Sequence, residues 1–420
     1  MDFSQADLLD RDVHGPNAES FYEWLREKAP LYYDAKNSLW AVSRYDDVVY
    51  VSKHTEIFCN RFGVVPGIPL DMWPDEAMIN LDGDEHTCQR ALVSKGFTPR
   101  RIGALEGKLR GFVDELVDRV AERGECDLVM DFARSLPMRI IGELLGYPRE
   151  CHDQVLDWTD VYVDAGSCGV ASVTDEVMEN FQNFCAFHEQ ILAQRQQQRG
   201  DDLISVWIDA EIDGKRLSEE KLLYEHNLLL VGGSETTRHA ISAGMLELLA
   251  RPDDVAFLRE HPEAIPNAVE EMIRFTCPFV RMQRTLLEDH EMHGTTMKQG
   301  DKIVVLYPAA NRDPRVWERP QTFDIRRSFE KPALSFGYGK HYCLGASLAR
   351  LEMKVFLERV LTRLPDLRLS PDAGAAAKPS AFLRGLARLP VVFTPVSPLS
   401  DVINAVVDAD ADAEASAANQ

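Results

Sequence analysis

The sequence predicts a mostly α fold of the α+β class, in which one helical domain carries small, segregated β-sheets. Helical periodicity dominates residues 84–249, where apolar side chains recur every three or four positions. Strand patterns flank this region: 38–54 indicates a strand or hairpin followed by a short helix, and further strands are expected within 279–314 and 389–396. Helices and strands confined to different parts of a chain are typical of α+β proteins.

Residues 1–398 are predicted to form a single domain, because no internal repeat and no clear linker divides the chain. The hydrophobic content of 45% over 420 residues is that of a globular protein with a sizeable core. Residues 399–420 differ, since they contain five acidic residues, no basic residue and little to bury. We expect this acidic tail to be disordered.

Charge and cysteine content exclude several classes of protein. The formal net charge of -22 argues against a general affinity for nucleic acid or anionic lipid, because both would be repelled. The first thirty residues lack the pattern of a secretory signal, and no run of about eighteen apolar residues predicts membrane insertion. The eight cysteines include no C-x-x-C pair. We therefore expect a cytoplasmic protein with reduced thiols.

One cysteine, Cys343, lies in the glycine-rich stretch "SFGYGKHYCLGASLAR" (335–350). The next segment has helical spacing, set by Leu344, Leu348, Leu351 and Val355. The cysteine is thus predicted at or just before a helix N-terminus, where free amides and the helix dipole favour a thiolate.

Several roles for Cys343 remain open at this point. A nucleophile needs a base, and His341, two residues away in the same loop, is awkwardly placed for that pairing. Zinc needs three or four ligands, and no second Cys/His cluster has ligand spacing. Haem needs a single thiolate. An arbitrary lone cysteine is most often a buried structural residue.

The loop matches the pattern F-G-x-G-x-H-x-C-x-G at six positions: Phe336, Gly337, Gly339, His341, Cys343 and Gly345. In this it resembles the haem-binding loop of the cytochrome P-450 superfamily in its bacterial form. The resemblance implies a cytochrome P-450 fold around buried haem b, with Cys343 as the proximal iron ligand. It also implies that His341 bonds a haem propionate and that Phe336 packs beside the sulfur.

A long helix is predicted from an N-cap at Ser218 to a stop at Pro252, about thirty residues. Its centre departs from helical preference, because Gly232 and Gly233 together cost about 2 kcal/mol relative to alanine. Such a departure in a long buried helix indicates a functional site. A helix kink beside a solvated acid is the alternative.

The central pattern G-G-x-E-T-T, from Gly232 to Thr237, is similar to the central helix of the same superfamily. The resemblance implies that the glycines make room for dioxygen. It also implies that Glu235 and Thr236 form the catalytic acid–alcohol pair, which supplies protons for cleavage of the O–O bond. Glutamate stands here where relatives often carry aspartate.

Two further sets of residues match the superfamily. The E-x-x-R pair Glu271 and Arg274, with Arg327 as a third member, is expected to form a structural ion network, although a surface salt bridge explains that spacing in most proteins. The haem propionates are expected to be held by charge-assisted hydrogen bonds from His86, Arg90 and Arg284 together with His341.

The resemblance implies a monooxygenase that uses O2 and two externally supplied electrons to hydroxylate a hydrophobic molecule, such as a sterol, terpenoid, fatty-acid or natural-product skeleton. The chain carries no flavin fingerprint and no cysteine set for a cluster, so we expect a ferredoxin and its NAD(P)H-dependent reductase as electron donors. A hydrogen-peroxide-dependent peroxygenase and a non-enzymatic haem-thiolate sensor or carrier are the alternatives.

Substrate contacts are expected from mostly apolar residues in four segments. They are Met72, Trp73, Leu228, Leu229, Gly232, Val280, Met282, Phe382 and Leu383. Core packing is an equally common role for any one of them. Docking of an acidic ferredoxin is assigned to six basic residues expected near the cysteine side of the haem: Lys95, Arg100, Arg101, Lys340, Arg350 and Lys354.

Overall fold

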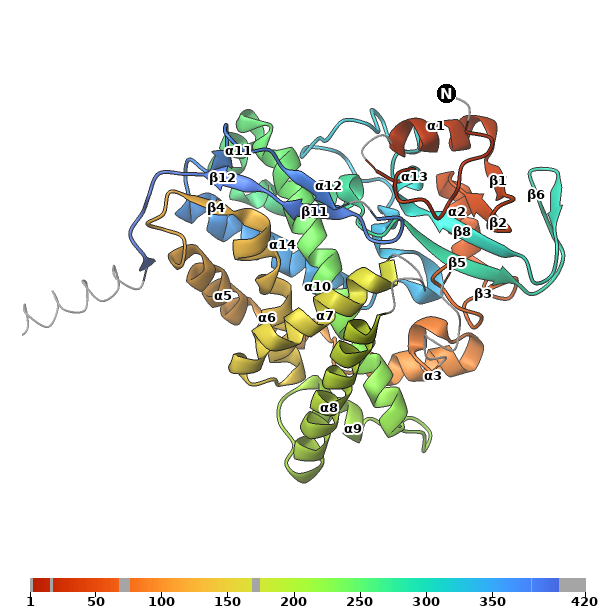
Figure 1. The fold of residues 1–420 in the computed structure, drawn as a ribbon, viewed down its shortest axis with the longest axis horizontal. Coiled ribbons are helices and arrows are strands. Elements are labelled where there is room, and N and C mark those ends of the chain that lie inside the picture. Colours follow the sequence, from red (N-terminus) through yellow and green to blue (C-terminus); the bar gives the residue numbers. More distant parts are fainter. Residues whose placement is uncertain (1–2, 16–17, 68–75, 168–173, 379, 400–420) are drawn as a thin grey trace, which may run out of the picture.

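Most of the helices lie together on one side of the molecule, and the largest sheet lies on the other side with a few shorter helices beside it (Figure 1). The structure is a computed structural model that describes residues 3–15, 18–67, 76–167, 174–378 and 380–399. Met72 and Trp73, two predicted substrate contacts, lie outside the described residues. The predicted mixture of a large helical region with small, separate sheets is confirmed.

The described helices follow the chain in this order: α1 (Ala18–Lys28), α2 (Tyr45–Lys53), α3 (Gly83–Ser94), α4 (Pro99–Ala104), α5 (Glu106–Asp118), α6 (Ser135–Leu145), α7 (His152–Ser167), α8 (Asp175–Gln197), α9 (Leu203–Asp209), α10 (Glu219–Leu249), α11 (Pro252–Glu260), α12 (Ile265–Thr276), α13 (Tyr307–Ala310) and α14 (Ala346–Arg363). The strands are β1 (Leu31–Asp34), β2 (Leu39–Val42), β3 (Phe58–Cys59), β4 (Glu125–Asp127), β5 (Arg281–Leu286), β6 (His290–Met292), β7 (Thr295–Met297), β8 (Lys302–Leu306), β9 (Arg368–Leu369), β10 (Ala376–Lys378), β11 (Gly385–Arg388) and β12 (Pro390–Val392).

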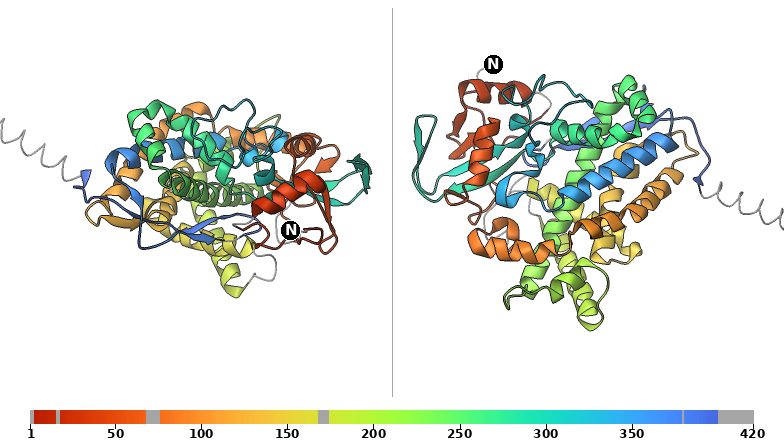
Figure 2. Two further views of the ribbon diagram at one scale, coloured as in Figure 1. Left: turned by 90° about the horizontal axis from the view of Figure 1, so that it is seen from above. Right: turned by 180° about the vertical axis from the view of Figure 1, so that it is seen from behind.

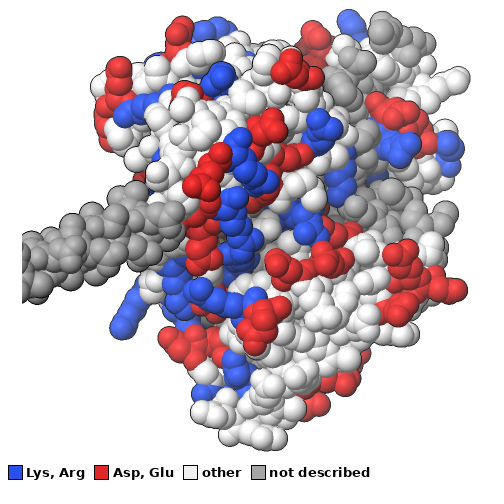
Figure 3. Space-filling view, turned by 60° about the vertical axis from the view of Figure 1, so that its left-hand side comes forward, with Lys and Arg blue, Asp and Glu red and all other residues white. Residues whose placement is uncertain are grey.

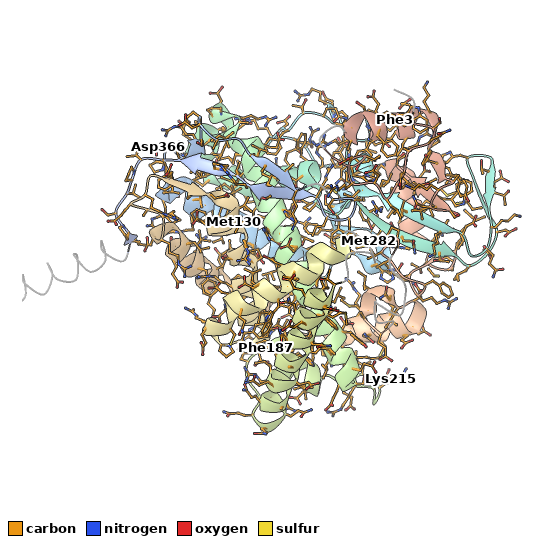
Figure 4. The ribbon with its side chains drawn as sticks, viewed as in Figure 1. Phe3, Met130, Phe187, Lys215, Met282 and Asp366 are labelled. Carbon is orange, nitrogen blue, oxygen red and sulfur yellow. The ribbon has the colours of Figure 1, made fainter. Side chains whose placement is uncertain are left out.

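The largest sheet joins the N-terminal part of the chain to its last third. Its strand order is β1-β2-β8-β5-β3. Strand β8 pairs parallel with β2, with Trp40 opposite Ile303, and antiparallel with β5. Four of the five residues of β8 are buried, as expected for a central strand covered on both faces. This pairing carries the start of β5 toward the middle of the molecule, where Met282 lies (Figure 4).

Helix α10 runs through the helical region and is enclosed by other helices along much of its length (Figure 2). Its N-cap is Ser218, whose hydroxyl accepts a hydrogen bond from the Lys221 amide at 3.1 Å, as the sequence predicts. A Cβ on Gly233 would lie 2.6 Å from Ile141 of α6, and a Cβ on Gly244 would collide with Met272 of α12. These two glycines therefore allow α6 and α12 to pack closely on α10.

No helix in the described ranges is both long enough and apolar enough to cross a membrane. Helix α14, which follows the cysteine loop, lies beside α5 and is tied to it by ion pairs (Figure 2). Arg359 contacts Asp114 at 2.6 Å, and Arg363 contacts Asp118 at 2.6 Å. Acidic and basic side chains alternate on the face shown in Figure 3, so this face carries no continuous patch of one sign.

Glu271, Arg274 and Arg327 form one buried network beneath the cysteine loop. Arg274 donates two hydrogen bonds of 2.7 Å to the Glu271 carboxylate, and Arg327 Nε donates a third of 3.0 Å. Arg274 also donates to the Asn311 carbonyl at 2.8 Å. The Asn311 side chain in turn donates to Ser335 Oγ at 2.7 Å, at the start of the cysteine loop. The network thus connects α12 to the loop through hydrogen bonds.

Replacing Glu271 by glutamine is expected to destabilise the protein strongly. The change leaves two buried guanidinium groups without a carboxylate, and breaking a buried ion pair in this way typically costs about 3–5 kcal/mol. The free energy of unfolding from a denaturant titration measures the loss.

The neighbouring Glu270→Gln variant is the matched control. Glu270 pairs with Arg350, and both side chains are about one-third exposed (30% and 35%). Loss of such a partly exposed pair is expected to cost no more than about 1 kcal/mol. Equal losses in the two variants would contradict a stabilising role for the buried network.

Candidate active site

A large, mostly apolar cavity lies between the middle of α10 and the cysteine loop. Its wall is completed by the segment after β3, by α3, and by β5 with the segment before it. Its volume, counting the open mouth, is about 1760 Å³.

The cysteine loop presents the Cys343 side chain to this cavity. Two of its glycines have left-handed backbone conformations, with φ of 71° at Gly337 and 74° at Gly339. A Cβ on Gly339 would also lie 2.6 Å from the Ser52 carbonyl of α2, so glycine is required there for two reasons. The Cys343 amide donates to the Phe336 carbonyl at 2.9 Å, which folds the loop back on itself.

Cys343 lies just before a helix N-terminus, as the sequence predicts. Helix α14 begins three residues later, at Ala346. The Cys343 side chain is exposed at the cavity surface. Enclosure by the surrounding protein raises the pKa of its thiol, whereas the amides of Gly345 and Ala346 and the charges of Arg90 and Arg350 lower it. The loop therefore supplies hydrogen bonds and nearby positive charge that favour a thiolate at the cavity surface.

Basic groups gather on one part of the cavity wall. His86 and Arg90 come from α3, Arg284 from β5 and His341 from the cysteine loop, and all four line the cavity. Arg90 donates to the Tyr342 carbonyl at 2.6 Å, and Arg284 donates to the Gln283 carbonyl at 2.7 Å. Neither arginine forms an ion pair with a carboxylate of the described residues. Two largely buried cations without a counter-charge fit an anionic ligand.

The two imidazoles add hydrogen-bond donors to this part of the wall. Their rings are 4.1 Å apart, and His86 Nε2 is buried without a hydrogen-bond partner among the described residues. Burial, followed by the charge of Arg90, lowers the pKa of His86 to about 4. Burial, followed by Arg284, lowers the pKa of His341 to about 2. An anion bonded to these side chains would satisfy them, so this group fits the two propionates of a haem whose iron faces Cys343.

Gly232 and Thr236 face the cavity from the middle of α10. A Cβ on Gly232 would meet no atom within 4 Å, so this glycine leaves open space in the wall. The Thr236 hydroxyl donates to the Gly232 carbonyl at 2.6 Å, one turn earlier. The helix nevertheless continues without interruption through the two glycines. The hydroxyl is therefore held at the cavity surface by its own helix.

Glu235 does not line the cavity, although the sequence predicts it as the partner of Thr236. Its side chain is 1% exposed and accepts a hydrogen bond of 2.7 Å from Arg238, which also lies 3.3 Å from Asp160 of α7. Burial raises the pKa of Glu235, but His239 and Arg238 together hold it below its ordinary range. Burial and the nearby Glu235 raise the pKa of Asp160 to about 6. Ion pairing turns Glu235 away from the cavity.

Most of the described residues predicted as substrate contacts do line the cavity: Leu228, Leu229, Gly232, Met282 and Phe382. Val280 and Leu383 do not, and their prediction is wrong. The neighbouring residues Phe279 and Phe382 take the cavity side instead, with ring centroids 5.0 Å apart. Val280 and Leu383 are buried in the surrounding protein, with exposures of 0% and 4%.

Two acidic residues of the described wall, Glu225 and Glu352, were not predicted. Glu225 lies on α10 and Glu352 on α14, and each is 1% exposed. Burial raises the pKa of Glu352 well above its ordinary value, and its Oε2 has no partner among the described residues. A signal for Glu225 is present in the sequence, because it shares the helical spacing of Leu229, Gly232 and Thr236.

Comparison with known proteins agrees with this geometry. The cytochrome P450 family model matches residues 138–381. The chain is 41% identical over 397 residues to the steroid C26-monooxygenase of Mycobacterium tuberculosis, covering 94% of this chain and 98% of the relative. It is 35% identical over 406 residues to the methyl-branched lipid omega-hydroxylase of Mycobacterium bovis, covering 92% of each protein.

Solved structures show the same fold. The crystal structure of CYP109E1 from Bacillus megaterium in complex with testosterone has a TM-score of 0.82 at 31% identity, covering 90% of this chain and 99% of that one. The cytochrome P450 PksS of Bacillus subtilis has a TM-score of 0.83 at 34% identity, covering 92% and 99%. This chain therefore belongs to the cytochrome P450 family and is a haem-dependent monooxygenase.

Proposed function

We propose that this monooxygenase hydroxylates the aliphatic end of a steroid or of a similarly elongated, branched lipid. The observation that supports the proposal most directly is an apolar cavity that runs along α10 to the Cys343 side chain. The likeness to a steroid C26-monooxygenase and to a methyl-branched lipid omega-hydroxylase, over more than nine-tenths of the chain, supports the same class of substrate. Both named activities oxidise an elongated molecule near one end.

The residues of the cavity have distinct parts in this proposal. Cys343 would bind the haem iron, and Arg90, Arg284, His86 and His341 would hold the propionates. When bound, haem supplies the activation of O2 that attack on unactivated carbon requires. The apolar side chains exclude water and hold the hydrocarbon by burial of its surface.

In this proposal Thr236 takes part in proton transfer. Its hydroxyl faces the cavity and donates its one proton to the Gly232 carbonyl, which leaves its acceptor sites free for water. To donate toward the dioxygen site, the hydroxyl must exchange this bond within its own helix for one across the cavity. Glu235, one residue earlier, is held by Arg238 and lies away from the cavity. It can pass a proton to Thr236 only if water joins them or if its ion pair with Arg238 opens.

An acidic ferredoxin with its NAD(P)H-dependent reductase is the proposed electron donor. Four of the six basic residues assigned to docking contact groups of their own chain: Lys95 the Glu211 carbonyl, Arg101 Asp201, Arg350 Glu270, and Lys354 Glu106 and Glu358. Arg100 and Lys340 are exposed, and neither forms an ion pair within the described chain. Docking should therefore depend mainly on these two. A rate of reduction by ferredoxin that is insensitive to salt would contradict this surface.

Steroids with an intact aliphatic side chain are expected to bind the ferric enzyme and to give singly hydroxylated products. Displacement of water from the haem pocket changes the absorption of the ferric haem, so a titration measures binding directly. Mass spectrometry after turnover with O2, ferredoxin and reductase locates the added oxygen. Binding without oxygenation would instead favour a sensor or carrier.

Replacing Cys343 by serine is expected to remove the absorption band after which the family is named, recorded on the reduced enzyme under carbon monoxide. A hydroxyl group cannot replace the thiolate as electron donor to iron. Cys88→Ser is the control, because Cys88 lies on α3 but does not line the cavity. Retention of the band in the Cys343 variant would show that another residue binds the iron.

Replacing Thr236 by alanine is expected to lower product formation about a hundredfold, because a positioned proton donor typically contributes that much. Electrons from the reductase should then appear mainly as hydrogen peroxide, measured together with product per NAD(P)H consumed. Ser242→Ala, which removes a buried hydroxyl of α10 outside the cavity wall, is the control. Full activity of Thr236→Ala with hydrogen peroxide alone would favour the peroxygenase alternative.

A further inference from the structure

We propose that Glu225 is a specificity-determining residue that binds a hydroxyl or ketone oxygen at the end of the substrate remote from the carbon that is oxidised. This inference rests on the proposed function, because it assumes an elongated lipid in the cavity along α10. It adds a requirement for one oxygen atom at the far end of that lipid.

Glu225 lies on the same face of α10 as Thr236. The two residues are eleven positions apart, which is about three helical turns and about 16 Å along the axis. Leu229 and Gly232 lie between them on the same face, and all four residues line the cavity. One stripe of the helix thus runs from a hydroxyl at the oxidation site, past apolar surface, to a carboxyl group.

The two oxygens of the Glu225 carboxyl group have different surroundings. Oε1 accepts hydrogen bonds from the Met78 amide at 2.6 Å and from Gln89 Nε2 at 2.7 Å, and so connects α10 to α3 and to the segment before it. No hydrogen bond from the described residues reaches Oε2. The side chain is 1% exposed and lines the cavity. Oε2 is therefore the oxygen available to a ligand.

A buried carboxyl oxygen in an apolar wall needs a partner. Leaving such an oxygen unpaired costs more free energy than an ordinary hydrogen bond contributes. A bound lipid that covers Glu225 must therefore either form a hydrogen bond with Oε2 or bind more weakly, because it displaces water from that oxygen. The other acidic residue of the described wall, Glu352, lies on α14 behind the cysteine loop. Glu225 is thus the acidic group at the end of the cavity remote from Cys343.

The protonation state of Glu225 suits both kinds of oxygen. Burial raises the pKa of its carboxyl group to about 7, although the hydrogen bonds from Gln89 and Met78 and the charge of Lys221 lower it. Near neutral pH both forms are present. The ionised form accepts a hydrogen bond from a hydroxyl group, and the protonated form donates one to a ketone.

The test compares two steroids that differ only in the oxygen at C3, each with the intact aliphatic side chain. Their dissociation constants are measured on the ferric holoenzyme by absorption titration. Wild type is expected to bind the oxygenated steroid about tenfold more tightly, the factor given by one hydrogen bond in a buried site. Glu225→Leu should reduce this ratio to near one by weakening only the oxygenated steroid.

Two further variants distinguish a role of Glu225 in ligand binding from a role in holding the structure together. Glu225→Gln keeps an oxygen for Met78 and Gln89 and places an amide donor near the position of Oε2, so most of the preference should be restored. Glu220→Leu, an exposed position on the same helix, should leave the ratio unchanged. If Glu225→Leu does not take up haem, Glu225→Asp, one methylene shorter, should also lose most of the preference.

A structural role alone gives a different result. If Glu225 acts only by joining Met78 and Gln89 to α10, Glu225→Leu weakens both steroids equally, the ratio stays near tenfold, and the proposal is wrong. If neither steroid binds wild type, the steroid assignment fails. The ratio of the dissociation constants for a long-chain alcohol and the corresponding alkane then tests the role of Glu225 independently of the steroid assignment.

Discussion

The position of the cysteine loop depends on a buried ion network that has no part in the chemistry. Glu271 pairs with Arg274 and Arg327, and Arg274 continues through the Asn311 carbonyl. The Asn311 side chain then contacts the loop twice: it donates to Ser335 Oγ and accepts from the Leu334 amide, each at 2.7 Å. Because these groups are buried, each lost contact leaves an unsatisfied polar atom, and the loop therefore has one favoured conformation.

Helix α10 meets two opposed demands on its two sides. Against α6 and α12 it must come close, and Gly233 and Gly244 permit that approach. Toward the cavity it must leave space, and Gly232 does so. The adjacent residues Gly232 and Gly233 thus meet opposite demands, one leaving space and the other allowing close packing, and both lower the helical propensity of α10. Packing around the helix compensates for the lost propensity, since most helical stability in proteins comes from tertiary contacts.

Local patterns in the sequence correctly predicted those elements whose structure depends on interactions between residues close together in the chain. The limits of α10 follow from Ser218 and Pro252, and the cysteine loop follows from its glycines and the helix after it. The errors concern contacts between distant segments. Val280 and Leu383 were placed on the cavity side, but their neighbours Phe279 and Phe382 take that side, because the way two distant segments meet decides which side chain faces the cavity.

Glu235 shows the same limit for charged groups. Its neighbour Thr236 was predicted from a short motif, and the backbone positions of both residues follow from the helix. The direction of the Glu235 side chain is set instead by Arg238 one turn later and by Asp160 on α7. Glu225 was missed for a related reason, since its partners Met78 and Gln89 lie more than 130 residues earlier in the chain. No local pattern contains such pairings.

Selectivity in a cavity of this kind has to come from few groups. Apolar contacts distinguish molecules weakly, because one methylene group changes binding by only about 1–3 kcal/mol. They also allow an elongated hydrocarbon to slide along the cavity or to enter end for end. A single polar group at a fixed distance from the oxidation site removes that freedom, because the substrate can form a hydrogen bond with it in only one orientation. The one-sided hydrogen bonding of Glu225, about three helical turns from Thr236, is an arrangement that would select both the molecule and the end that is oxidised.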